Sequence, residues 1–107
     1  MAVTIKSLAQ GQLPNAKGTL YTAAGQVIVR RINLVNTGAG INSVNVYKKT
    51  AAGTSKRIIP VALALDPGDQ AICIEDDVMT LETGDLIEGD ATNASEVDYV
   101  IDGVTRS

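Results

Sequence analysis

The sequence predicts an all-β protein, and three observations support that prediction. Short runs rich in Val, Ile and Leu alternate with polar residues, and clusters of Gly, Pro, Asn, Asp and Thr separate these runs. No segment carries a capped apolar stripe at helical spacing. Such a pattern is typical of a single antiparallel β-sandwich, of the jelly-roll or immunoglobulin-like kind, with about seven to eight short strands.

Length and composition favour one globular domain that lacks large aromatic side chains. The chain has 107 residues, of which 45% are hydrophobic and 20% are charged, so a single core rather than disorder is expected. It contains three Tyr and neither Phe nor Trp. The core must therefore consist mainly of Val, Ile, Leu and Ala, and the β-branched residues among these favour the pleated surface of a sheet.

Alternation of apolar and polar residues places the individual strands. We expect strands near residues 19–23, 26–36, 41–50, 56–65, 70–75, 78–82, 86–90 and 96–104. The expected core consists of the apolar residues that share one face of these strands, namely Val27, Val29, Ile32, Leu34, Val44, Val46, Ile59, Val61, Leu63, Leu65, Val97, Tyr99 and Ile101.

One strand changes its alternation phase. In residues 26–36 the apolar phase set by Val27 and Val29 differs from the phase set by Ile32. These side chains reach the same core only if one extra residue lies between them, so a β-bulge is expected at Arg30-Arg31.

A proline interrupts another expected strand. Pro60 lies inside residues 56–65, and proline has no backbone N–H to donate to a neighbouring strand. This segment is therefore expected to be an edge strand or to bend at Pro60.

The N-terminal segment has little periodicity. Residues 1–18 contain Gly11, Pro14 and Gly18, which indicates an extended arm or a loosely attached first strand ahead of a sandwich domain at residues 19–107. The arm is expected to pack on a neighbouring subunit rather than on its own core, because no partner strand is evident for its apolar residues Val3, Ile5, Leu8 and Leu13.

Two turns share the form Leu-x-x-Gly-Asp. They lie at residues 65–69 and 81–85. In the first, Pro67 fixes φ at the second turn position and Gly68 supplies the positive φ of a type II turn, while the aspartate accepts from nearby amides. A pair of metal-binding aspartates is the functional alternative, but turn chemistry accounts for every residue, so no metal site is predicted.

The sequence favours a protein without catalytic activity. It contains no His, the commonest general base and partner of nucleophilic Ser or Cys. A carboxylate pair is formally available among twelve acids, but these acids lie in turns and at alternate strand positions, where solvated side chains are expected. No glycine-rich loop precedes a helix, and the single Cys73 lies in an apolar alternating run typical of a buried thiol. We therefore predict no enzyme activity and no cofactor.

The charges are divided between the two halves of the chain. Residues 1–65 carry a net charge of +8 with no acid, and residues 66–107 carry −11. The charges either neutralise within one sandwich or stay on separate flanks that meet between neighbouring subunits. A nucleic-acid partner is not expected, because the isoelectric point is about 4.7 and aromatic residues are few. No signal peptide or membrane span is evident at the N-terminus or beyond it.

The order of several motifs resembles a group of small β-sandwich proteins from the structural gene clusters of tailed bacteriophages. The motifs are Leu13-Pro14, Leu20-Tyr21-Thr22, Val29-x-x-Ile32-x-Leu34-x-Asn36, Val44-x-Val46-Tyr47, Arg57-Ile58-Ile59-Pro60, the two turns, and Val97-Asp98-Tyr99-Val100-Ile101-x-Gly103. They are turn and core patterns that span nearly the whole chain, and no catalytic residue comes with them.

The resemblance implies a virion protein made in the cytoplasm of a host bacterium. The first expectation is a capsid decoration (cement) protein that bridges subunits of the major capsid protein, as a homo-oligomer and preferably a trimer. A tail, neck or baseplate protein is one alternative. A fibre-type host- or glycan-binding module is the other, and it would depend on the three tyrosines.

The expected interface combines the apolar arm residues with opposite charges. Besides Val3, Ile5, Leu8 and Leu13, the candidates are the basic pairs Arg30, Arg31, Lys48, Lys49, Lys56 and Arg57, which are expected to meet the acids Glu75, Asp76 and Asp77 across a subunit boundary.

Overall fold

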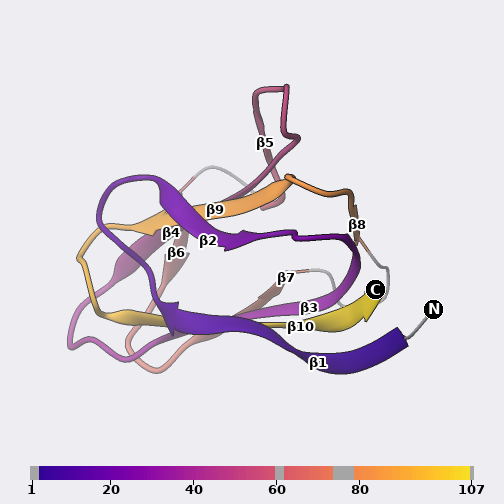
Figure 1. The fold of residues 1–107 in the computed structure, drawn as a ribbon. Helices are drawn as coiled ribbons and strands as arrows, with labels where there is room; N and C mark the ends of the chain where they lie inside the picture. The colour runs from indigo at the N-terminus through magenta and orange to yellow at the C-terminus, as the bar shows by residue number, and fades with distance from the viewer. Residues whose placement is uncertain (1–2, 60–61, 74–78, 107) are drawn as a thin grey trace.

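The protein is a sandwich of two antiparallel five-stranded sheets (Figure 1). The computed structural model describes residues 3–59, 62–73 and 79–106, and no helix occurs among them. The all-β sandwich predicted from the sequence is confirmed. The strands are β1 Val3–Gln12, β2 Gly18–Thr22, β3 Gln26–Asn36, β4 Asn42–Lys49, β5 Ser55–Arg57, β6 Leu63–Leu65, β7 Gln70–Cys73, β8 Met79–Leu81, β9 Leu86–Ala91 and β10 Val97–Arg106.

The strand order identifies the sandwich as a jelly roll. Sheet A has the order β1-β10-β3-β7, with β8 also paired to β3, and sheet B has the order β2-β9-β4-β5, with β6 also paired to β4. The pairs are nested along the chain: β1 pairs with β10, β2 with β9, β3 with β7 and β8, and β4 with β5 and β6. Such nesting is what results when one long antiparallel hairpin is wrapped into two facing sheets.

The core lies between the sheets and is almost entirely aliphatic. Ten of the residues expected in the core are buried: Val27, Val29, Ile32, Leu34, Val44, Val46, Leu65, Val97, Tyr99 and Ile101. Ile59 and Leu63 are only half-buried, and Val61 lies outside the described residues. The core is completed by residues that the sequence analysis did not select, namely Leu13, Leu20, Ala23, Leu81, Ile87 and Ala91.

The expected bulge is present in β3. Arg31 pairs with Asp102 and Val29 pairs with Gly103, so Arg30 is the extra residue. Burial changes phase there, because Val29 and Ile32 are both buried while the two arginines between them are exposed. On the other side of β10 the register of β1 slips by one residue at Leu8. Bulges on both neighbours therefore flank the same part of β10.

The N-terminal segment forms an integral strand. Residues 3–12 make up β1 and pair with β10 along its whole length. Leu13 follows directly and is fully buried, and its N–H donates to the Val97 carbonyl oxygen at 2.8 Å. Of the two sequence interpretations of this segment, the attached strand is observed. The expectation that Leu13 packs on a neighbouring subunit is wrong, because Leu13 belongs to the subunit's own core.

The segment around Pro60 interrupts an edge strand. β5 and β6 both pair with β4 at the edge of sheet B, and the ladder is broken between Arg57 and Leu63. Pro60 itself lies outside the described residues. The expected edge position is therefore confirmed, and the chain leaves the ladder on both sides of the proline.

The two Leu-x-x-Gly-Asp turns carry the chain from one sheet to the other and dock in the same way. Gly68 and Gly84 have φ of 83° and 90°, the left-handed region that glycine adopts without strain. The Gly68 N–H donates to the Asn36 carbonyl oxygen at 2.8 Å, and the Gly84 N–H donates to that of Ala23 at 2.8 Å. Each aspartate carboxylate accepts the amide N–H three residues earlier, as Asp85 does from Glu82 at 3.0 Å. The aspartates are thus structural parts of the turns.

Gly103 lies in the part of β10 between the two bulges, and its close packing leads to a stability prediction. A Cβ added at Gly103 would overlap the Ile28 carbonyl oxygen and crowd the Leu8 side chain, whereas a Cβ at Gly40 would meet nothing within 4 Å. We expect Gly103→Ala to lower the free energy of unfolding by about 2–4 kcal/mol, because backbone must shift to admit the methyl group. Gly40→Ala is the matched control and should change it by less than about 0.5 kcal/mol. Urea unfolding measures both, and equal effects would contradict the packing described for Gly103.

Candidate interaction surface

The outer face of sheet B carries a polar network that is satisfied within the subunit. On β4 the Asn45 side chain donates from Nδ2 to Asp90 Oδ1 at 2.8 Å and accepts from Arg57 Nη1 at 2.6 Å. Nearby, Lys17 Nζ donates to Ser55 Oγ at 3.3 Å, and Ser55 Oγ donates to Glu88. On this face, hydrogen bonds through the neutral side chains of Asn45 and Ser55 therefore link basic residues of the first half of the chain to acids of the second half.

Tyr47 lies between two cations on the same face. Lys17 Nζ and the Arg57 guanidinium carbon each lie 5.0 Å from the centroid of its ring. Such cation–π contacts stabilise the ring and restrict access to both the ring and the cations. Arg57, expected at an intersubunit interface, is thus held within its own subunit.

The outer face of sheet A differs, because its central strands present several valine and isoleucine side chains outward, among polar ones such as Asn33, Asp98 and Asp102. Alternation with the buried residues of β3 and β10 places Val100 and Val104 of β10 outward, together with Ile28 and Val35 of β3. Val104 is paired with Ile28, and Ile72 of β7 lies beyond β3 on the same face. Ile28 is 41% exposed and Ile72 is 37% exposed. We call this set the apolar face of sheet A: Ile28, Val35, Ile72, Val100 and Val104.

The bulge adds two arginines to the same region. Arg30 and Arg31 are exposed, and their side chains form no hydrogen bond or ion pair with the part of the chain that the structure describes. A regular strand would direct consecutive residues to opposite faces, whereas a bulge turns the extra residue to the face of its neighbour. Valine and isoleucine side chains beside arginines that have no partner among the described residues are a combination found in protein interfaces.

Three acids were expected to be the partners of these arginines. Glu75, Asp76 and Asp77 lie outside the described residues. The flanking strands are described: Cys73 at the end of β7 pairs with Ile32, and Met79 at the start of β8 pairs with Val29. β7 and β8 therefore meet β3 on either side of the two arginines in the same chain. Pairing of these acids with basic residues across a subunit boundary stays a prediction.

The remaining basic candidates lie on the β4–β5 hairpin. Lys48 Nζ donates to the Thr80 carbonyl oxygen of β8 at 2.9 Å and so links sheet B to sheet A. Lys49 and Lys56 pair in register with Ser55 and Lys48. Their ammonium groups make no hydrogen bond or ion pair with described residues.

The apolar candidates of the N-terminal segment separate in the structure. Leu8 is half-buried against the core, so it is a packing residue of its own subunit. Val3 and Ile5 lie in β1 at register positions opposite Arg106 and Val104. A contact of these two residues with another subunit stays a prediction.

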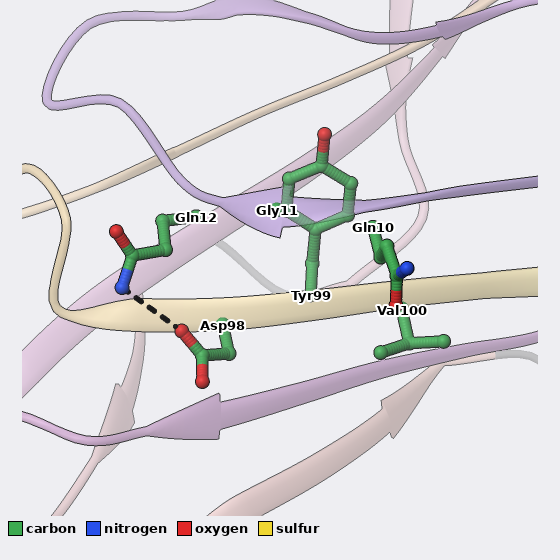
Figure 2. Close-up of a pocket in the computed structure, with 6 residues that line it drawn as sticks. All are labelled: Gln10, Gly11, Gln12, Asp98, Tyr99 and Val100. Atoms are coloured by element: carbon green, nitrogen blue, oxygen red, sulfur yellow. Dashed lines mark hydrogen bonds between the residues drawn. The ribbon is translucent and has the colours of Figure 1, made fainter.

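A shallow hollow lies where β1 meets β10 (Figure 2). It is lined by Gln10, Gly11, Gln12, Asp98, Tyr99 and Val100. Gly11 leaves room above the Tyr99 ring, whose nearest atoms lie 3.3 Å from where a Cβ would stand. Gln12 Nε2 donates to Asp98 Oδ1 at 3.1 Å, and Figure 2 shows Tyr99 and Val100 on opposite sides of β10. The hollow therefore borders the apolar face of sheet A.

The tyrosines do not form an aromatic platform for a sugar. Tyr99 is buried, and its hydroxyl donates to the Leu20 carbonyl oxygen at 3.4 Å. Tyr21 packs partly against the core, and Tyr47 is flanked by its two cations. Glycan-binding sites use exposed rings, so this arrangement disfavours the glycan-binding alternative. Among the described residues no cluster of three metal-ligating side chains is present, and no helix there is long and apolar enough to cross a membrane.

Comparison with known proteins yields a structural similarity and no sequence match. No family model and no curated protein matches the chain. The chain is similar to one in the acidic stable capsid structure of Helicobacter pylori bacteriophage KHP30, with a TM-score of 0.56 and 16% identity, over 97% of this chain and 86% of that one. A chain of infectious bursal disease virus, Gt strain, gives a TM-score of 0.47 and 12% identity, over 96% of this chain and 32% of that one. The first similarity shows a shared fold.

Burial of two tyrosines leads to a pH prediction. Burial raises the pKa of Tyr99 and of Tyr21 above the ordinary value of 10.0. The folded state then holds these protons more tightly than the unfolded state, so their stabilising contribution is present below pH 10 and is lost as the pH rises above it. We expect Tyr99→Phe to lose less stability than the wild type between pH 9 and pH 11. Urea unfolding across this range measures the difference. Since the lysines are common to both proteins, identical slopes would contradict the burial of Tyr99.

Proposed function

We propose that this protein is a non-enzymatic decoration (cement) protein of a bacteriophage head, which binds the assembled shell and bridges neighbouring capsid subunits. The observation that carries the proposal is the fold shared with a phage capsid chain over 97% of this chain and 86% of that one. Coverage this high means that the similarity concerns most of that capsid chain rather than one part of it. The jelly-roll strand order agrees, because this fold recurs in viral capsid proteins.

The proposed mechanism needs surfaces rather than a reactive site. A subunit that binds only the assembled lattice shifts the equilibrium towards that lattice by mass action, as a ligand stabilises the folded state that it binds. Contacts to two adjacent capsid subunits act together, because the first contact raises the effective concentration of the second. Repetition over many equivalent positions then makes a weak contact sufficient.

The chemistry of the two outer faces supports one orientation on the shell. On sheet B, groups such as Asn45 and Glu88 are already hydrogen-bonded to neighbours, so a water-facing position suits this face. On sheet A, removal of Ile28 and Ile72 from water is favourable. Arg30 and Arg31, which have no partner among the described residues, supply side chains that commonly anchor interfaces. We place the apolar face of sheet A against the lattice of the major capsid protein and sheet B towards solvent.

Heads that lack the protein provide the test. We expect added wild-type protein to bind these heads and to raise their disruption temperature. The double variant Ile28→Asp with Ile72→Asp should bind about tenfold more weakly or worse, because two carboxylates would be buried in an apolar contact. Co-sedimentation with heads measures binding, and light scattering during heating measures disruption.

A matched variant tests whether binding is lost because the docking face is changed or only because negative charge is added. Thr22→Asp with Ala64→Asp adds the same charge at exposed positions of sheet B and should bind like the wild type. Circular dichroism should show that all variants are folded. Equal losses in both double variants would reject the assigned face. Wild-type protein that binds isolated tails but not heads would reject the decoration role itself.

A further inference from the structure

The free edge of sheet B has opposite charge at its two ends. β5 and β6 form this edge, where they pair with the two ends of β4. At the C-terminal end of β4 the β4–β5 hairpin projects from the body of the sandwich (Figure 1). The hairpin presents the small exposed residues Ala51 and Ala52 between Lys49 and Lys56. We call these four residues the basic tip.

The N-terminal end of β4 carries the opposite charge, next to an exposed hydrophobic side chain. Ile41 precedes β4 and is 60% exposed, more than any other large hydrophobic side chain in the described part of the chain. Asn42 pairs with Leu65, so Ile41 lies next to Asp66 across the ladder. Asp66 and Asp69 are exposed in the following turn. We call Ile41, Asp66 and Asp69 the acidic end.

Hydrogen bonds through Asn36 hold the acidic end in one conformation. The buried Asn36 side chain donates from Nδ2 to the carbonyl oxygens of Gly40 at 2.8 Å and Leu65 at 2.9 Å. Its Oδ1 accepts from the Gly38 N–H at 2.9 Å and from Asn42 Nδ2 at 3.1 Å. The segment before β4 and the end of β6 are thereby tied to the same side chain. A preorganised surface loses little conformational entropy when it binds.

The basic tip and the acidic end cannot meet within one subunit. β4 has 8 residues, and a strand of that length spans roughly 25 Å. Screening at physiological salt acts over about 8 Å, so the two charges barely interact in a monomer. The basic tip carries the positive charges of Lys49 and Lys56, although Asp85 accepts the Ala51 N–H there at 3.1 Å, and the acidic end carries two negative charges. Their exposed charges are therefore complementary between copies.

We propose that the basic tip of one copy docks on the acidic end of the next, so that copies of this chain associate head to tail along the free edge of sheet B. The methyl groups of Ala51 and Ala52 cover Ile41, while Lys49 and Lys56 face Asp66 and Asp69. A contact between two different patches closes into a ring when its rotation allows and otherwise continues as a chain. This contact involves only copies of this chain and does not depend on the proposed role on a phage head.

Sedimentation velocity of the isolated protein tests the proposal. We expect the wild type to associate with increasing concentration at low salt and to dissociate in 0.5 M NaCl. Lys49→Glu with Lys56→Glu should weaken association about tenfold or more, and Asp66→Lys should do the same, because each creates like-charge contacts. Asp69 is left unchanged because its carboxylate accepts the Asp66 N–H and holds the turn.

A mixture of the two variants gives a result specific to a head-to-tail contact. The lysine variant keeps an intact acidic end, and the Asp66→Lys variant keeps an intact basic tip. An equimolar mixture should therefore associate again, because each variant supplies the patch that the other lacks. Arg30→Glu with Arg31→Glu makes the same change in net charge on sheet A and should associate like the wild type. A monomeric wild type at low salt, a mixture that stays monomeric, or loss of association in the arginine variant would each overturn the proposal.

Discussion

The antiparallel pairing of the first strand with the last is the constraint on which the rest of the structure depends. β10 occupies the interior of sheet A, between β1 and β3, and among the described strands it is the only partner of β1 in that sheet. The other pairs are nested inside this one. Gly103 in β10 lies between the bulge at Leu8 and the bulge at Arg30, where a side chain would strike backbone. Non-local pairing of this kind also predicts slow folding.

The basic first half and the acidic second half of the sequence do not form two separate halves of the molecule, and the nested topology explains why. Because early strands pair with late strands, Lys17 and Arg57 come to lie beside Glu88 and Asp90 on sheet B. Among the described residues, charges that remain separated from an opposite charge include those at the two ends of β4. Part of the surface is apolar because the central strands of sheet A carry Val or Ile on both faces at several positions.

Much of the fold was predictable because its signals are local. Period-two alternation identified most strands, the phase change located the bulge at Arg30, and the positive φ of Gly68 followed from turn chemistry. β1 was not recognised as an integral strand because its partner is at the other end of the chain, and periodicity in residues 3–12 is weak. Leu13 was misassigned for the same reason, since its burial depends on that distant pairing.

The candidate surface was predicted only in part. Arg30 and Arg31 were selected from the sequence, and they do lie exposed at the apolar face of sheet A. Lys48 and Arg57 were selected on charge alone, but they are engaged within the subunit. Ile28, Val100 and Val104 were missed although their signal was present. Apolar residues at adjacent positions, as in Tyr99-Val100-Ile101, imply that both faces of the strand are apolar, but only the facing sheet shows which face is covered.

A decoration subunit of a phage head is present in many copies, bound at equivalent positions of the shell. The number of copies of this protein in each particle therefore tests the proposed role directly. Quantitative mass spectrometry of purified particles gives the ratio of this protein to the major capsid protein. We expect a copy number that approaches that of the major capsid protein, since every equivalent site on the lattice is a binding site. A ratio lower by one to two orders of magnitude, on the order of a single ring of subunits, would contradict it and indicate a neck or tail position.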